Sequence, residues 1–142
     1  MLSAEIKTVF FQSALLMVLL RFMLSVFSFG TIRRHVVSFI ANQNNAVSQR
    51  KKCSRRDIVV AVKLASKYFL ATNRCLIESI VLWGLFKRQG YPANLRIGIR
   101  KDAGAALNAH AWVESEGIIA IGWLPDLSRF ILLPPLKWEK VG

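Results

Sequence analysis

Residues 95–123 read "LRIGIRKDAGAALNAHAWVESEGIIAIGW", and the first six of them alternate between apolar and polar side chains. This two-residue period is typical of a β-strand with one face in water. Residues 108–115 and 118–123 have the character of two further strands, and Glu116-Gly117 between them has the composition of a tight hairpin turn. The stretch therefore predicts a small antiparallel sheet.

The segments before residue 95 have the spacing of helices instead. A capping-box pattern, Ser54 followed by Asp57, marks one helix start, and Gly90 marks a helix end. The first segment is apolar almost all round, which predicts a central core helix. Four helices are predicted in all: residues 3–28, 31–41, 55–70 and 75–88. With a last strand at about 128–133, the chain is predicted to be an α+β protein in which N-terminal helices pack on a small antiparallel sheet.

At 142 residues the chain has the length of a single domain. The polar and then basic stretch without periodicity in its first half is predicted to be an exposed linker. The predicted parts are N-terminal helices (1–41), a basic linker (42–54), a core (55–133) and a tail (134–142).

The composition combines 54% hydrophobic residues with a formal net charge of +12. The charge favours an anionic partner. A basic run of Arg50, Lys51, Lys52, Arg55 and Arg56 is either a solvated face or a docking site for such a partner. Nucleic acid is discounted, because no recognition motif or interleaving of aromatic and basic residues accompanies the charge. Two cysteines without zinc-type spacing predict neither a disulfide framework, a metal site nor a cofactor, and favour a reducing compartment.

Residues 8–32 are long and apolar enough for a membrane span or a signal peptide, and contain one charged residue, Arg21. A charge near the middle of a span costs roughly 2.5 to 3.5 kcal/mol on insertion scales. No small-residue cleavage site follows the apolar run. A helix buried in protein or lying in an interface is therefore favoured, and membrane association is left open.

Cys75 follows Asn73-Arg74 at the predicted start of the fourth helix. Unpaired backbone N–H groups and the helix dipole stabilise a thiolate at this end of a helix, and Arg74 adds to the effect. A small core residue is the alternative for a cysteine followed by Leu76-Ile77. Cys75 is thus a candidate nucleophile whose role depends on a base nearby.

His110 is the candidate base, on a strand where it shares a face with Trp112 and Glu114. The flanking residues Ala109 and Ala111 leave room for another group to approach the imidazole. A core histidine bonded to a backbone carbonyl is the alternative. A nucleophile at a helix start and a base on a following strand is the arrangement used for cysteine acyl transfer.

Residues 74–117, "RCLIESIVLWGLFKRQGYPANLRIGIRKDAGAALNAHAWVESEG", resemble the core of the transglutaminase-like leader peptidases of bacterial lasso-peptide maturation. The resemblance implies a papain-like cysteine protease fold. It also implies that Cys75 attacks the carbonyl at the junction of leader and core peptide, and that its backbone N–H is the first oxyanion donor. His110 would take the thiol proton and later protonate the leaving amine.

The family usually has a third residue, an aspartate on the strand after the histidine, and here the sequence departs from that pattern. Counting back from a two-residue turn places Trp123 opposite His110. Asp126 comes three residues later and is the candidate third residue, with Asn108 as a substitute and a Cys-His dyad as the alternative. Glu114 lies too far along the strand for a direct bond to His110, which favours a solvated or salt-bridged role for it.

The predicted function is therefore a cysteine peptidase of the bacterial cytoplasm that removes the leader from a lasso precursor peptide. The resemblance implies two further partners, a separate leader-recognition protein and an ATP-dependent lasso cyclase. The alternative is a non-catalytic, membrane-attached or scaffolding member of the same fold, anchored by residues 8–32. Amide transfer instead of hydrolysis would pass through the same thioester.

Overall fold

The computed structural model describes residues 4–26, 53–70, 74–104 and 106–134. The predicted second helix, residues 42–52 of the predicted linker and nearly all of the predicted tail lie outside these ranges. The described helices are α1 (Ala4–Val26), α3 (Arg55–Phe69) and α4 (Arg74–Arg88). The described strands are β1 (Asn94–Lys101), β2 (Leu107–Ser115), β3 (Ile118–Ile121) and β4 (Ile131–Leu132).

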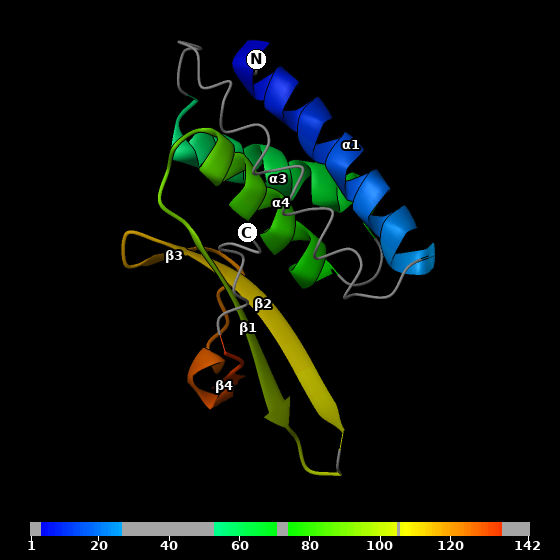
Figure 1. Cartoon of the computed structure of the whole chain (residues 1–142), viewed down its shortest axis with the longest axis vertical. Helices are drawn as coiled ribbons and strands as arrows, with labels where there is room; N and C mark the ends of the chain where they lie inside the picture. The colour runs from blue at the N-terminus through cyan, green and yellow to red at the C-terminus, as the bar shows by residue number, and fades with distance from the viewer. Residues whose placement is uncertain (1–3, 27–52, 71–73, 105, 135–142) are drawn as a thin grey trace, which may run out of the picture.

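The strands form one antiparallel sheet in the order β3-β2-β1-β4. The helices lie together on one side of it, and the long hairpin of β1 and β2 extends beyond them (Figure 1). The predicted α+β class is confirmed. The last strand is shorter than predicted, because the 3-10 turn η2 (Leu127–Arg129) takes up the start of that segment.

Helix α3 begins where the sequence indicates. The Ser54 hydroxyl accepts a hydrogen bond from the Asp57 N–H at 3.2 Å. The linker prediction is wrong for Cys53, however, since only 4% of this residue is exposed. The Tyr91 hydroxyl donates to its carbonyl oxygen at 2.8 Å, which holds the segment against the end of α4. Burial raises the pKa of the Cys53 thiol, and the nearby carboxylates Asp57 and Glu5 raise it further.

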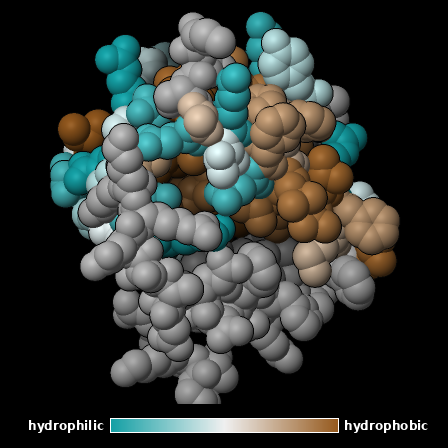
Figure 2. Space-filling model, turned by 90° about the horizontal axis from the view of Figure 1, so that it is seen from above, coloured by the Kyte–Doolittle hydropathy of each residue, from teal (hydrophilic) through white to brown (hydrophobic). Residues whose placement is uncertain are grey.

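Helix α1 is buried on one face only, so the prediction of a central core helix is wrong. Its buried residues are Val9, Ser13, Ala14, Met17 and Leu20. The opposite face is an exposed apolar stripe of Phe11, Leu15, Val18, Leu19, Phe22 and Val26. Figure 2, which looks down on the helical layer, shows hydrophobic residues gathered on this side of the molecule. By length and composition α1 is also able to cross a membrane, although 28% of its most apolar window is buried inside the protein.

Shortening a side chain on the buried face of α1 is expected to lower the free energy of unfolding more than shortening one on the exposed face. Met17 is fully buried whereas Leu15 is 63% exposed. Met17→Ala is expected to lower the free energy of unfolding by about 2–5 kcal/mol, because it removes buried methylenes and leaves a cavity. Leu15→Ala, the control, is expected to change it by less than about 0.5 kcal/mol. Urea denaturation of both variants measures the difference, and equal costs would contradict the one-sided burial of α1.

The hairpin between β2 and β3 turns at Glu116-Gly117, as predicted. Both residues have positive φ, 52° and 77°, which is the backbone of a type I′ turn. Ser115 pairs with Ile118, but the register then shifts by one residue, so that Val113 pairs with Ile121. This β-bulge makes the counting that placed Trp123 opposite His110 wrong, because one extra residue is accommodated in β3.

Candidate functional site

Cys75 lies in the first turn of α4, which begins at Arg74. The residue is half-buried and forms no disulfide. The guanidinium of Arg74 lies 3.9 Å from the Glu78 carboxylate one turn further on. The negative charge of Glu78 therefore offsets part of the effect that Arg74 has on a thiolate at the helix start. The sulfur is therefore at the end of the helix where backbone N–H groups lack intrahelical acceptors.

His110 lies on β2 opposite Gly98 of β1. Its Nε2 atom is 2.7 Å from the carbonyl oxygen of Gly122. A carbonyl oxygen only accepts hydrogen bonds, so Nε2 carries the proton and donates it. In the neutral ring, Nδ1 is left with the lone pair and is able to act as a base. The bond is the one expected of a structural histidine, and it also fixes the tautomer that a base would need.

Two aromatic side chains hold the His110 ring in place. The Trp112 ring stacks nearly parallel to it at a centroid distance of 6.1 Å, and the Phe130 ring is tilted against it at 5.7 Å. Gly98 leaves the space for this cluster, because a Cβ atom there would lie 2.9 Å from the Cβ of Phe130 and 3.2 Å from the Trp112 ring. The position of the imidazole is therefore set by packing as well as by its hydrogen bond.

Cys75 and His110 come from elements in contact, but their side chains are not joined. Helix α4 contacts β2, and Val113 of β2 belongs to the core shared with the helices. Side chains alternate along a strand, so His110 belongs with Trp112 to the other face of β2. Within the described ranges no hydrogen bond links the Cys75 thiol to the His110 ring.

Gly122 is a site residue that the sequence analysis missed. Its φ is +85°, and a Cβ atom there would lie 2.6 Å from the Ala111 carbonyl oxygen and 2.7 Å from the Trp112 Cβ. Only glycine lets the backbone approach β2 this closely and present its carbonyl to His110. An isolated glycine at the end of a strand pattern was the available signal, because it marks a bulge or a close backbone approach.

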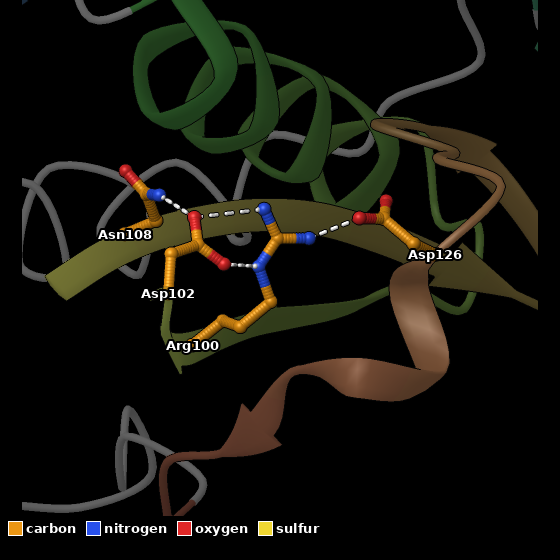
Figure 3. A network of polar contacts seen from close by, with 4 residues as sticks. All are labelled: Arg100, Asp102, Asn108 and Asp126. Atoms are coloured by element: carbon orange, nitrogen blue, oxygen red, sulfur yellow. Dashed lines mark hydrogen bonds and ion pairs between the residues drawn. The ribbon is translucent and has the colours of Figure 1, made fainter. Parts of the chain in front are cut away.

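The candidates for a third residue belong to a separate polar network (Figure 3). Arg100 lies at its centre, with Nε 2.7 Å from one oxygen of Asp102 and a terminal nitrogen 3.1 Å from the other. Asp126 accepts a hydrogen bond from Arg100, and the Asn108 amide donates to Asp102. Among the described residues, neither Asp126 nor Asn108 forms a hydrogen bond with His110.

Arg100 also connects this network to the histidine cluster. Its guanidinium lies over the Phe130 ring, 4.8 Å from the centroid, and Phe130 packs against His110. Glu114 has the predicted salt bridge, with Arg96 at 3.1 Å, and it also accepts from the Trp112 indole N–H at 3.1 Å. Asp126 therefore reaches the aromatic residues around the imidazole through Arg100, whereas Glu114 contacts Trp112 directly.

The Arg100 network predicts a pH dependence. The hydrogen bond from Arg100 lowers the pKa of Asp102 from its ordinary value of 3.8, and the Asn108 amide adds to the effect. Because the folded pKa is lowered, the stabilisation is fully present above pH 3.8 and is lost as the pH falls through the folded pKa. Arg100→Met is expected to move the pKa of Asp102 up towards 3.8, as measured by NMR titration of the carboxyl carbon. Arg96→Met, on the same strand but paired with Glu114, should leave the titration of Asp102 unchanged.

Comparison with known proteins places the fold in a family. The family model described as the transglutaminase-like superfamily matches residues 16–131, which run from within α1 to the first residue of β4. No curated protein and no solved structure matches the chain significantly. The matched range includes Cys75, His110 and Gly122. The chain belongs to the transglutaminase-like superfamily, which includes cysteine peptidases.

Proposed function

We propose that this protein is a cysteine peptidase that cleaves the leader from a lasso precursor peptide through a thioester intermediate. The observation that carries the proposal is the His110 ring, whose Nε2 is held by the Gly122 carbonyl so that Nδ1 is available as a base. Cys75 at the start of α4 supplies the nucleophile, and both Cys75 and His110 lie within the range that the family model matches. The resemblance of residues 74–117 to leader peptidases supports the substrate class.

In the proposed reaction, Nδ1 of His110 takes the proton of the Cys75 thiol, and the sulfur forms a bond to the scissile carbonyl carbon. The backbone N–H of Cys75 donates to the oxyanion. The carbon–nitrogen bond then breaks as His110 returns the proton to the leaving amine, and water hydrolyses the thioester. The first step needs sulfur and Nδ1 within about 3.5 Å. In this structure His110 lies on the face of β2 turned away from α4, so the proposed reaction requires a rearrangement of β2 that turns the imidazole towards the start of the helix.

The Gly122 carbonyl takes the orienting role that an aspartate has in the family pattern. A neutral carbonyl orients the ring but stabilises the imidazolium charge less than a carboxylate does. Asp126 enters the proposed site as a positioning residue, since it binds Arg100, which lies over the Phe130 ring beside His110. The catalytic pair is thus Cys75 and His110.

The proposed reaction takes place in the bacterial cytoplasm with two partners. A separate leader-recognition protein presents the precursor, and an ATP-dependent cyclase closes the ring on the released core. The net charge of +12 supports docking of an anionic partner.

Mass spectrometry of a precursor peptide encoded beside the gene of this chain, incubated with the chain and the adjacent recognition protein, tests the proposal. Hydrolysis gives two products whose masses sum to that of the precursor plus one water. A product that has gained an amine instead of water identifies amide transfer from the same thioester. Intact precursor, or cleavage that persists in Cys75→Ala, would overturn the proposal.

A second candidate function is a membrane-attached scaffold in which the cysteine and histidine are inert. The exposed apolar stripe on α1 favours it, because a face of six large apolar side chains is able to contact lipid. Carbonate extraction of cell membranes discriminates between the two functions. A scaffold anchored by a spanning helix stays in the pellet, whereas the proposed peptidase is released.

A further inference from the structure

An open groove lies at the end of the molecule opposite the start of α4. It has a volume of ≈ 320 Å³ and is lined by Val59 and Val60 of α3, Phe86 of α4 and Ile119 of β3. Two cations, Arg55 and Arg56, also line it. The groove is therefore apolar inside and basic at its border.

One side of the groove is an open sheet edge. Strand β3 is the first strand in the sheet order and pairs only with β2. Within the described ranges its outer edge has no backbone hydrogen bond, and Ile118 is 71% exposed. An open edge beside an apolar pocket is the combination that binds an extended peptide, because backbone bonds add a strand while the pocket takes a side chain.

The two arginines on the border of the groove differ in whether they already pair with a carboxylate. Arg55 lies 2.5 Å from the Glu116 carboxylate and over the Tyr91 ring. Arg56 is exposed and has no ion-pair partner among the described residues. Arg56 is thus the cation able to pair with an acidic side chain on a docked peptide.

The groove also has a defined distance from the proposed nucleophile. Phe86 follows Cys75 by eleven residues on α4, which corresponds to about 16 Å along the helix axis. An extended peptide covers about 3.3 Å per residue. A chain that occupied both places would therefore span the interval with about five residues.

We propose that this groove binds an extended segment of the peptide substrate as an added strand on β3, with one apolar side chain in the cavity and an acidic side chain on Arg56. The position of that segment, about five residues from the cleaved bond, rests on the proposed peptidase function. The groove then selects substrates by an apolar-acidic pattern away from the scissile bond.

Binding is tested on the Cys75→Ala variant, which cannot turn over a substrate by the proposed mechanism. The probe is a fluorescein-labelled peptide of three Leu-Glu repeats, and the control probe has three Leu-Lys repeats. Fluorescence anisotropy should show binding of the acidic probe only, and hydrogen exchange should slow at the Ile119 N–H when it binds. Equal binding of both probes, or no protection on β3, would overturn the proposal.

Variants in the groove locate the binding. Arg56→Glu should weaken binding of the acidic probe by 10-fold or more, whereas Lys101→Glu, an equal charge change at the far end of β1, should alter it less than 2-fold. Val60 is 38% exposed and lines the groove, so the large side chain of Val60→Trp should fill the groove and abolish binding of the acidic probe. Protection of Ile119 that depends on protein concentration instead of peptide would identify a second copy of the chain as the occupant and overturn the proposal.

Kinetics with the precursor separate this inference from the proposed function. If both hold, Arg56→Glu raises KM and leaves kcat unchanged. Cleavage with an unchanged KM in Arg56→Glu would overturn the groove and leave the peptidase. Probe binding in the groove without precursor cleavage by the chain with Cys75 intact would support the groove and overturn the peptidase.

Discussion

Replacing Cys75 with alanine is expected to lower the rate of precursor cleavage by about 10⁴-fold or more, because the thioester path has no nucleophile without the sulfur. The fold should be kept, since Cys75 is a half-buried residue in the first turn of α4 and alanine is a good helix former. The measurement is the single-turnover rate of product formation followed by mass spectrometry, with circular dichroism to show that the helices remain.

Cys53 provides the matched control for this substitution. It is the second free cysteine, but it is buried, and its burial beside Asp57 and Glu5 raises the pKa of its thiol. Cys53→Ala should therefore leave the cleavage rate within a few-fold of that of the unchanged chain. A similar loss of rate in both cysteine variants would point to a folding effect and contradict the assignment of Cys75 as nucleophile.

Alkylation gives the same assignment without a substrate. Iodoacetamide reacts with thiolates that solvent can reach, so it should modify Cys75 before the buried Cys53. Peptide mapping after limited labelling is expected to find the adduct on Cys75. Earlier labelling of Cys53 would show that the two sites are not exposed as the structure has them.

The second large effect is expected at Gly122. Gly122→Ala combines a left-handed backbone, which costs a residue with a side chain about 1–2 kcal/mol, with an overlap that costs typically about 1–3 kcal/mol. The overlap arises because the new Cβ would lie 2.6 Å from the Ala111 carbonyl oxygen. We expect the free energy of unfolding to fall by about 2–5 kcal/mol, as measured by urea denaturation.

Gly117→Ala separates the two contributions, because Gly117 also has a positive φ, 77°, but nothing lies within 4 Å of the added Cβ. It should cost about 1–2 kcal/mol, the contribution of the left-handed backbone alone. Equal losses in the two variants would mean that the close approach of Gly122 to β2 contributes nothing.

A readout at the imidazole shows whether Gly122 positions the histidine. In the unchanged chain, the bond to the Gly122 carbonyl keeps the proton of the neutral ring on Nε2. Nitrogen NMR of His110 should detect a single tautomer there and a mixture of the two in Gly122→Ala. A tautomer that does not change would contradict the positioning role.

The sequence predicted the parts of the fold that depend on neighbouring residues. The strands β1 and β2 and the Ser54 cap of α3 arise from local hydrogen bonds and periodicity, and they are confirmed. The prediction that one face of β1 lies in water is wrong at Gly98, which is buried. The turn at Glu116-Gly117 was also predicted, since positive φ at both positions suits these residues. The location of Cys75 at a helix start follows from the same kind of local information.

The surroundings of the candidate site were not predictable in this way. Asp126 was expected beside His110, but in the structure it accepts a hydrogen bond from Arg100, 26 residues away in sequence. The cation with which a carboxylate pairs depends on how distant segments of the chain pack together. Counting residues along neighbouring strands does not give this information. The lasso-peptide substrate likewise stays a proposal drawn from the resemblance of residues 74–117.

The amino-acid sequence by itself determined the element types, the hairpin and the positions of Cys75 and His110 within their elements. Only the tertiary structure decided that β3 has a bulge, that the Gly122 carbonyl holds the imidazole and that one face of α1 stays exposed. The physical reason is the distance in sequence between the residues whose contacts decide each feature. Periodicity and caps depend on residues within a turn or two of one another, whereas register beyond a bulge and the burial of a helix face depend on contacts between segments far apart in the chain.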